Sequence, residues 1–355
     1  RGQLRASELL DGQGFARKVE QAYAMMFDAW EQSGARDPLA AMASTDLPDS
    51  AEAQCHLGMR LRDQGRDAEA EACFRRALAL DPLLTEALLP LGQLLDQRGS
   101  PIEAQAYLRR AAELRPQDAD AACQLGLHLK ERGAAAEALQ WLQRALDLQP
   151  DLMAAYLGAG ALLQTLGRLA DAETLWRRAI VALPQKVEGY DNLGNILQRQ
   201  GRMAESETCF RRAAQLRTGV EADYVLGLQL SELGRLEEAA DLLRRAAEGA
   251  GNHLGPWNAL ADVLKRLGRL TDARDCAQRM IAIAPGSSWG YSALAIVEQQ
   301  QGALHASEAH FRTAVALDPM QDKLYANLLF ILNYHPDKSA EEIYAAYEEY
   351  EERFG

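Results

Sequence analysis

The 355-residue chain carries 38 basic and 51 acidic side chains, for a formal net charge of −13. This balance disfavours nucleic acid as the main partner, because phosphate binding needs clustered Lys and Arg. Hydrophobic residues make up 48% of the chain and charged residues 25%, which excludes wholesale disorder. Val and Ile contribute only eight residues each, so the composition favours an all-α fold over a β or parallel-sheet α/β fold.

The first predicted element lies within residues 1–50. An apolar stripe on one helix is indicated by side chains spaced by 4, 4, 3 and 4 positions: Phe15, Val19, Tyr23, Met26 and Trp30. The residues 37–49 that follow carry two prolines and are interpreted as a linker. On spacing alone, the helix is interpreted as an N-terminal cap.

A repeat with a period of 34 residues begins after this linker. Glycines recur at this interval, with one interval of 33, at Gly65, Gly99, Gly133, Gly167, Gly201, Gly234, Gly268 and Gly302. A small residue stands seven positions before each of these glycines, and a proline stands seventeen positions after six of them. The spacing predicts eight helix–turn–helix units in residues 51–321, beginning near Ala51, Thr85, Ala119, Met153, Val187, Val220, Leu254 and Ser288. Each unit can bury its apolar face only against its neighbours, so a solenoid is expected.

The joints around the sixth and seventh units depart from this pattern. Thr218 and Gly251 replace the proline, and Asp223 takes a position that is aromatic in the fourth, fifth, seventh and eighth units. The linker over 248–256 is rich in glycine. A local irregularity or hinge is therefore predicted there.

Two further helices are predicted after the repeats. Residues 322–334 continue the pattern of the first helix of a unit and should cap the array. Within residues 335–355, Ser339 and Glu342 form a capping box that begins a last helix. Ile343, Tyr347, Tyr350 and Phe354 are expected on one face of it, and that face needs a partner, either the last repeats or a part outside these residues.

No catalytic or metal-binding motif is visible in the sequence. The six histidines show neither His-Glu-x-x-His spacing nor cysteines nearby, and the two Gly-x-Gly segments do not follow a predicted strand. The five cysteines are odd in number and widely spaced, as expected of reduced thiols in a cytoplasmic protein. No apolar stretch has the form of a signal peptide or a membrane span. His335 is interpreted as a solvent-exposed loop residue.

The 34-residue pattern resembles the tetratricopeptide repeat, and the family's fold is a right-handed superhelix. The segment from Asn333 to Glu342, directly after the repeats, resembles the junction with the glycosyltransferase domain in bacterial SPINDLY-like protein O-GlcNAc transferases. Leu4–Asp11, with residues 15–30, resembles the closing helix of that catalytic domain, which is the alternative to a cap.

This resemblance implies that the chain recruits acceptor proteins for a catalytic domain in cis that lies outside these residues. The implied donor is UDP-GlcNAc, bound by that absent domain, and the implied acceptors are Ser and Thr hydroxyls. No cofactor is expected within this chain itself. A homodimer is left open. The alternative is a stand-alone scaffold or adaptor that binds a protein partner, and an enzyme complete in itself is disfavoured because no catalytic set is present.

Arrays of this kind bind extended chains on the first helix of each unit. On the family's pattern, positions 2, 5, 9, 12 and 13 of a unit face the peptide groove. The candidate groove residues are Asp191, Asn192, Asn195, Gln198 and Arg199 in the fifth unit and Asn258, Asp262, Lys265 and Arg266 in the seventh. Asparagine can donate to and accept from a peptide backbone at once. A solvated polar helix face is the alternative interpretation.

Two departures limit what the resemblance implies. Only Asn192 and Asn327 match the asparagine ladder of the animal-type transferases, at the sixth position of the first helix. The Lys and Asn of a carboxylate clamp, as found in Hsp70/Hsp90 co-chaperones, are replaced in the early units by residues such as Cys55, Met59 and Leu89. A carboxylate clamp is therefore disfavoured, and the early groove is expected to be apolar.

Overall fold

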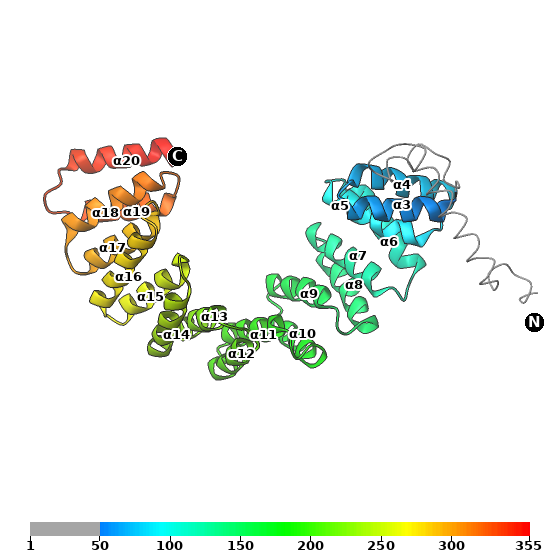
Figure 1. Cartoon of the computed structure of the whole chain (residues 1–355), viewed down its shortest axis with the longest axis horizontal. Helices are drawn as coiled ribbons and strands as arrows, with labels where there is room; N and C mark the ends of the chain where they lie inside the picture. Colours follow the sequence, from blue (N-terminus) through cyan, green and yellow to red (C-terminus); the bar gives the residue numbers. More distant parts are fainter. Residues whose placement is uncertain (1–49) are drawn as a thin grey trace, which may run out of the picture. The chain divides into compact units, whose positions relative to one another are not determined.

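The structure is a computed structural model that describes residues 50–355. The predicted N-terminal helix and its linker lie outside the described residues. Within that range helices are the only regular secondary structure, and the chain divides into two compact units, one ending at Gly158 and one comprising Ala159–Gly355. From here on, 'unit' means one of these two parts, and each helical hairpin of the sequence pattern is called a repeat. Figure 1 shows the helices following one another along the chain in paired hairpins.

The first unit contains three complete hairpins and the start of α9. Its helices are α3 (Ala51–Asp63), α4 (Asp67–Leu80), α5 (Thr85–Gln97), α6 (Pro101–Leu114), α7 (Ala119–Glu131) and α8 (Ala135–Leu148). The boundary between the two units falls inside α9 (Met153–Thr165).

The second unit continues the same alternation and ends with two additional helices. Its helices are α10 (Leu169–Ala182), α11 (Val187–Arg199), α12 (Met203–Leu216), α13 (Val220–Glu232), α14 (Leu236–Gly249), α15 (Leu254–Arg266), α16 (Leu270–Ile283), α17 (Ser288–Gln300), α18 (Leu304–Leu317), α19 (Asp322–Asn333) and α20 (Ala340–Phe354). We call the first helix of each repeat helix A and the second helix B. The predicted all-α repeat fold is confirmed.

Each turn inside a hairpin is closed by the repeated glycine. At Gly201, φ is +79°, a conformation that glycine adopts without the steric cost of a Cβ atom. Gly201 N donates to the Gln198 carbonyl and Arg202 N donates to the Leu197 carbonyl, both at 2.9 Å. These two bonds form a Schellman motif, which ends helix A and directs the chain into helix B.

The core of a hairpin is a close contact between positions 8 and 24 of the repeat. A Cβ atom added to Gly194 would lie 2.5 Å from the ring of Phe210, so only a glycine fits without movement. Position 24 holds a large buried side chain in repeats one to six and in repeat eight: Phe74, Leu108, Leu142, Trp176, Phe210, Leu243 and Phe311. Repeat seven has Ala277 there and places Met280 three residues later, where the other repeats have alanine, so the apolar volume is moved rather than lost.

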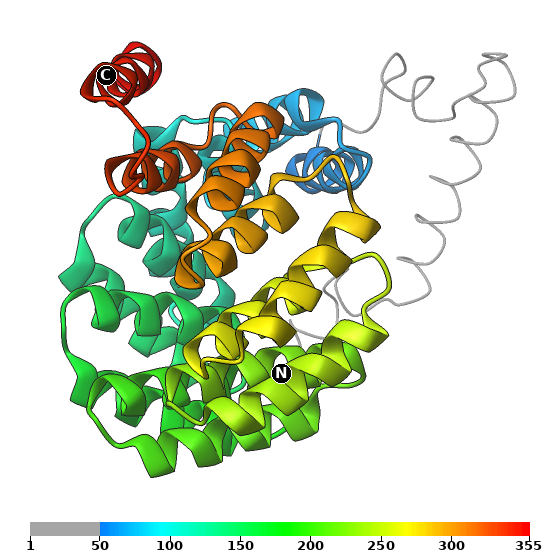
Figure 2. The same ribbon diagram turned by 90° about the vertical axis from the view of Figure 1, so that its left-hand side faces the viewer.

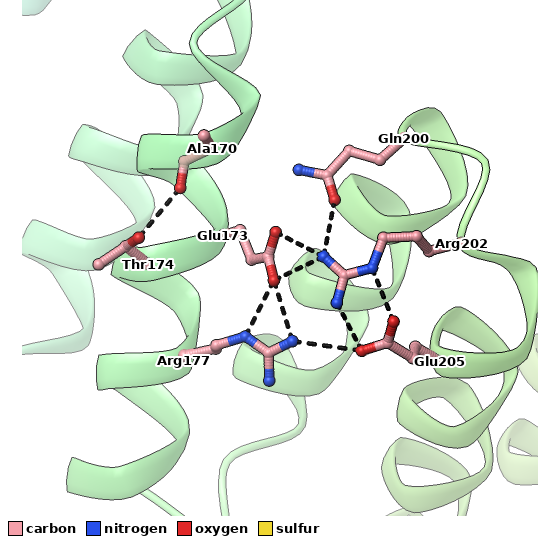
Figure 3. A network of polar contacts seen from close by, with 7 residues as sticks. All are labelled: Ala170, Glu173, Thr174, Arg177, Gln200, Arg202 and Glu205. Atoms are coloured by element: carbon pink, nitrogen blue, oxygen red, sulfur yellow. Dashed lines mark hydrogen bonds and ion pairs between the residues drawn. The ribbon is translucent and has the colours of Figure 1, made fainter.

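The helix B surface of each unit carries ion pairs between neighbouring repeats. An arginine at position 25 pairs with a glutamate at position 19 of the next repeat, with N···O distances of 2.5 to 3.4 Å: Arg75–Glu103, Arg109–Glu137, Arg177–Glu205 and Arg211–Glu238. In the second unit, an arginine at position 16 adds a bond back to position 21 of the preceding repeat, as in Arg202–Glu173 and Arg235–Glu207. Figure 3 shows one such network around Glu173, with Arg177 and Arg202 on either side of it. We call this set the helix B ladder.

The linkers on either side of the sixth repeat differ from the others. Gly219 and Gly251 have φ of +65° and +59°, whereas the linkers of the regular repeats contain no residue with positive φ. The predicted irregularity is confirmed, and a hinge at this place stays a prediction.

The C-terminal helices follow the predicted bounds closely. The capping box of α20 is present, with Glu342 N donating to Ser339 Oγ at 3.2 Å and Ser339 N donating to Glu342 Oε2 at 2.9 Å. The partner of α20 is α19, and Figure 2 shows α20 beside it at the end of the chain. The apolar face of α20 is formed by Ile343, Ala346, Tyr350 and Phe354. Tyr347, which was predicted on that face, is 44% exposed.

Candidate functional site

The candidate groove residues of α11 divide into anchored and free side chains. Arg217, in the linker after α12, donates two hydrogen bonds to the Asp191 carboxylate, one from Nη1 at 3.2 Å and one from Nη2. Asn192 Nδ2 donates to the Glu188 carbonyl of its own helix at 2.8 Å, so part of its amide is already used. Gln198 Nε2 donates to Glu232 of α13 at 3.5 Å.

The candidate residues of α15 are anchored in a similar way. Arg266 donates from Nη1 to Ser231 Oγ at 2.6 Å and from Nη2 to the Ser231 carbonyl at 3.0 Å. Lys265 Nζ lies 3.3 Å from Asp262 Oδ1 within the same helix. Because Ser231 and Glu232 are neighbours at the end of α13, the two halves of the predicted set meet there.

Three of the predicted residues have no partner within the part of the chain that the structure describes. They are Asn195, which is half-buried, and Arg199 and Asn258, which are exposed. These free side chains stand on the same helix A positions as the anchored ones. We call all nine predicted groove residues, five on α11 and four on α15, the helix A face of the second unit.

In the first unit, positions 5 and 9 of helix A are mostly apolar, whereas positions 12 and 13 carry charged or polar side chains such as Arg62, Asp63 and Lys130. Cys55 and Cys123 are buried, Met59 and Leu127 are half-buried, and Leu157 is 43% exposed. Burial raises the pKa of the Cys55 and Cys123 thiols to about 11, so neither is a thiolate at neutral pH. These cysteines therefore serve as small apolar side chains.

His335 is buried, so its interpretation as a solvent-exposed loop residue is wrong. Its side chain is only 1% exposed, and its ring packs edge-on against His305 with 4.3 Å between centroids. Nδ1 accepts a hydrogen bond from Asp337 N at 3.3 Å, and Nε2 lies 3.6 Å from Glu308 Oε2. The ring folds inward because it satisfies the backbone of the turn that leads into α20.

This turn also brings together three side chains with possible metal-ligand atoms, which their spacing in the sequence did not reveal. One atom each of His305, His335 and Asp337 lies within 4.8 Å of the other two. His335 Nδ1 already accepts a hydrogen bond from Asp337 N, and Lys338 Nζ lies 3.1 Å from Glu308 beside the ring. Because His335 serves the backbone of the turn in this way, we assign the cluster a structural role.

A second histidine pair was also missed. His128 of α7 is 1% exposed, and its Nδ1 lies 2.8 Å from Asp96 Oδ1 of α5. The two residues stand near the ends of helix A in consecutive repeats, like Ser231 and Arg266. A polar residue at position 10 facing an acid at position 12 of the previous repeat is the sequence signal for such a link.

Comparison with known families identifies this array. Two family models described as tetratricopeptide repeat match the chain, one at residues 51–84 and the other at 89–152, 157–220, 192–253 and 224–288. Together these ranges cover more than half of the chain. The chain belongs to the tetratricopeptide-repeat family. Tetratricopeptide-repeat proteins bind peptide or protein partners, so the helix A face is the candidate binding surface.

One solved tetratricopeptide-repeat structure supports the same fold, and two further solved structures match parts of the chain. A tetratricopeptide repeat protein from Parabacteroides merdae ATCC 43184 is 15% identical, with a TM-score of 0.50 over 70% of this chain and 98% of that chain. MamA is 25% identical over 45% of this chain and 94% of its own, with a TM-score of 0.43. YrrB, described as a TPR protein with an unusual peptide-binding site, is 20% identical over 47% and 86%, with a TM-score of 0.42.

The search of curated proteins gave no match to this tetratricopeptide-repeat chain. Among the described residues, no helix combines the length and the apolar character needed to cross a bilayer.

Proposed function

We propose that the chain binds an extended segment of a partner protein on the helix A face of the second unit. The observation that carries this proposal is the division of that face into fixed and free side chains. Gln198 and Arg266 are held by bonds to the end of α13, while Asn195 and Asn258 have no partner among the residues described. The fixed groups hold neighbouring A helices together, and the free groups remain available to a ligand.

The free groups have the chemistry that an extended backbone needs. A primary amide donates two hydrogen bonds and accepts two, so Asn195 and Asn258 can pair with both the N–H and the C=O of a peptide. Such bonds do not depend on the peptide's side chains. Arg199 and Asp262 carry opposite charges on the same face and would select among sequences.

The test compares peptide binding by wild type and a double variant, N195A/N258A. The probes are random 12-residue peptides displayed on phage, followed by anisotropy measurements on synthetic copies of the enriched sequences. With about 1 kcal/mol for one hydrogen bond from each asparagine, the double variant should bind about thirtyfold more weakly. Thr208→Ala, on helix B of the repeat that contains Asn195, is the control, because the Thr208 hydroxyl bonds only to its own helix. If the double variant binds every enriched peptide as tightly as wild type, the proposal is wrong.

A second candidate function is recruitment of acceptor proteins for a protein O-GlcNAc transferase-like enzyme. It is favoured by the resemblance of the Asn333–Glu342 segment to the junction in that family. In this function the catalytic domain would lie in cis, UDP-GlcNAc would be its donor, and the helix A face would hold the acceptor. The alternative is an adaptor that uses the same face without any transferase.

The flanking coding sequence distinguishes these two functions. Recruitment for a transferase requires that the reading frame continue from residue 355 into a two-lobed glycosyltransferase domain. An adaptor requires no such domain. A frame that encodes no glycosyltransferase on either side would remove this second function and leave peptide binding unaffected.

A further inference from the structure

A groove runs between helices α14 and α16 of the second unit, and α15 forms its floor. It contains two hollows of about 700 and 330 Å³ that share Glu248 and Trp257. The larger one is lined by residues at the end of α14 and along α16, including Ala247, Ala282 and Ile283. The smaller one is lined by Arg244, Leu260, Leu264, Asp272, Asp275 and Cys276 together with the two shared residues.

The lining residues have the spacing of single helix faces. On α16 they are 272, 275, 276, 279, 282 and 283, which is one stripe over about 16 Å of helix at 1.5 Å per residue. On α14 they are 244, 247 and 248, followed by 251 and 252 after the helix ends. The two hollows are therefore parts of one groove along the helices, long enough for about five extended residues or three helical turns.

The pair between positions 25 and 19 that forms the helix B ladder is missing at this groove. At the α12–α14 joint, Arg211 at position 25 crosses to Glu238 at position 19, with 2.6 Å between them. The same positions of the next joint hold Arg244 and Asp272, and aspartate is one methylene shorter. Arg244 lies 3.3 Å from Asp241 of its own helix, and Asp272 lies 2.6 Å from Arg269. The ion pair that joins α14 to α16 is Arg269–Glu237, at 3.6 Å, and neither of these residues lines the hollows beside Trp257.

The irregular linker before α15 borders the same groove. In the fourth and fifth repeats a tyrosine at position 4 donates to the carbonyl of the preceding linker proline, as Tyr190 does to Pro184 at 3.2 Å. Trp257 holds position 4 of the seventh repeat, and its linker has glycine in place of proline. The Trp257 indole N–H is buried without an acceptor among the described residues. Asn252 and Gly251 form one end of the groove where the proline would otherwise lie.

Negative side chains outnumber positive ones along the groove when the side chains that already form ion pairs are left out. Glu248, Asp275 and Arg279 have no hydrogen-bond or ion-pair partner within residues 50–355, and all three are exposed. The remaining charged groups of the lining, Arg244 and Asp272, are paired as described above. Two free carboxylates thus line the groove together with the apolar side chains of Trp257, Ala282 and Ile283, and a free guanidinium, Arg279, lies on α16 between Asp275 and Ala282.

We propose that this groove is a second binding site, for a segment of a partner protein that combines an apolar side chain with a Lys or Arg. The apolar side chain packs on Trp257, Ala282 and Ile283, and the cation lies between Glu248 and Asp275. A basic side chain suits this place because its methylenes cover the apolar floor while its charge reaches the carboxylates. Arg279 disfavours a second cation in the larger hollow, beside Ala282 and Ile283. The site does not depend on the helix A face, so either one can bind when the other does not.

A display experiment with a counter-selection tests this site. Random 12-residue peptides on phage are selected on the full chain and then depleted on the variant Ala282→Leu, whose added side chain fills the groove. Ala282 is exposed, so the variant should fold normally, which its thermal unfolding curve verifies. The peptides that remain should share an apolar residue near a Lys or Arg.

The affinities of these peptides are then measured by fluorescence anisotropy on matched variants. We expect at least a tenfold loss of affinity in Ala282→Leu and in E248Q/D275N. We expect no change in Ala79→Leu, which makes the same substitution at position 29 of the first repeat, or in N195A/N258A. The site is refuted if no peptide distinguishes wild type from Ala282→Leu. It is also refuted if the remaining peptides lack basic residues or bind E248Q/D275N as tightly as wild type.

Discussion

Arg202 donates from Nη1 to both carboxylate oxygens of Glu173, at 2.8 Å each, although the two residues are 29 positions apart. Glu173 belongs to helix B of one repeat, and Arg202 follows the helix A–helix B turn of the next. The Schellman turn at Gly201 fixes where the arginine leaves the helix. Arg177 donates to the same carboxylate, so one glutamate joins two arginines from neighbouring hairpins.

Replacing Glu173 by glutamine should weaken the contact between these hairpins. The Glu173 side chain is 17% exposed and that of Arg202 is 38% exposed, so solvent screens the pair in part. We therefore expect a loss of about 0.5–1 kcal/mol in the free energy of unfolding, measured by urea denaturation. Glu221→Gln is the control, because Glu221 is 73% exposed and 3.9 Å from Arg217, and it should change little.

The contribution of Glu173 should also depend on pH. Burial raises the pKa of this carboxyl, but the bonds from Arg202 and Arg177 outweigh that effect and hold it below the usual value of 4.5. A carboxyl whose pKa is lower in the folded state stabilises the protein above the unfolded pKa, and that stabilisation is lost as the pH falls through the folded value. The difference between wild type and E173Q should therefore be full at pH 7 and shrink below pH 4.5. An equal difference at pH 7 and pH 3 would contradict this assignment.

The repeat register was accessible from the sequence because the turns with positive φ favour glycine and the close contacts between helices admit only small residues. The same holds for the Ser339–Glu342 capping box, whose two bonds lie within one turn of chain. The partners of charged side chains were not accessible. Whether Arg244 crosses to Asp272 or stays with Asp241 depends on helix spacing and on one methylene group. His335 was misjudged because its burial follows from a turn whose fold depends on α18.

The close contact between Gly194 and Phe210 gives a prediction about packing. In Gly194→Ala the new Cβ would stand 2.5 Å from the ring, so the ring or helix must move, at a cost of about 1–3 kcal/mol in stability. Repeat eight has Ala295 opposite Phe311, so the fold itself should survive. Gly286→Ala is the control, since no atom lies within 4 Å of an added Cβ there. Equal melting temperatures for the two variants would show that the contact is not tight.

The buried thiols should react slowly in the folded chain. Burial raises the pKa of Cys276 from 9.0 to about 11, as it does for Cys55 and Cys123, so the thiolate fraction at pH 8 falls about a hundredfold. Titration with a chromogenic disulfide reagent at pH 8 should show these three reacting only as the chain opens. In urea all five cysteines should react at once. Rapid reaction of all five without denaturant would mean that the repeats open readily.

Ser339→Ala should loosen α20 without disturbing the repeats. The substitution removes the acceptor of the Glu342 N–H bond, and loss of such a cap costs about 1 kcal/mol of helix stability. α20 has no buried residue, and it is held by contacts such as Tyr350 Oη to Asp322 Oδ1 at 2.6 Å. We therefore expect amide hydrogen exchange in residues 340–354 to rise roughly fivefold, with exchange in α11–α16 unchanged. Ser339→Asp keeps a capping oxygen and should restore slow exchange; if it exchanges as fast as Ser339→Ala, the cap does not determine the stability of α20.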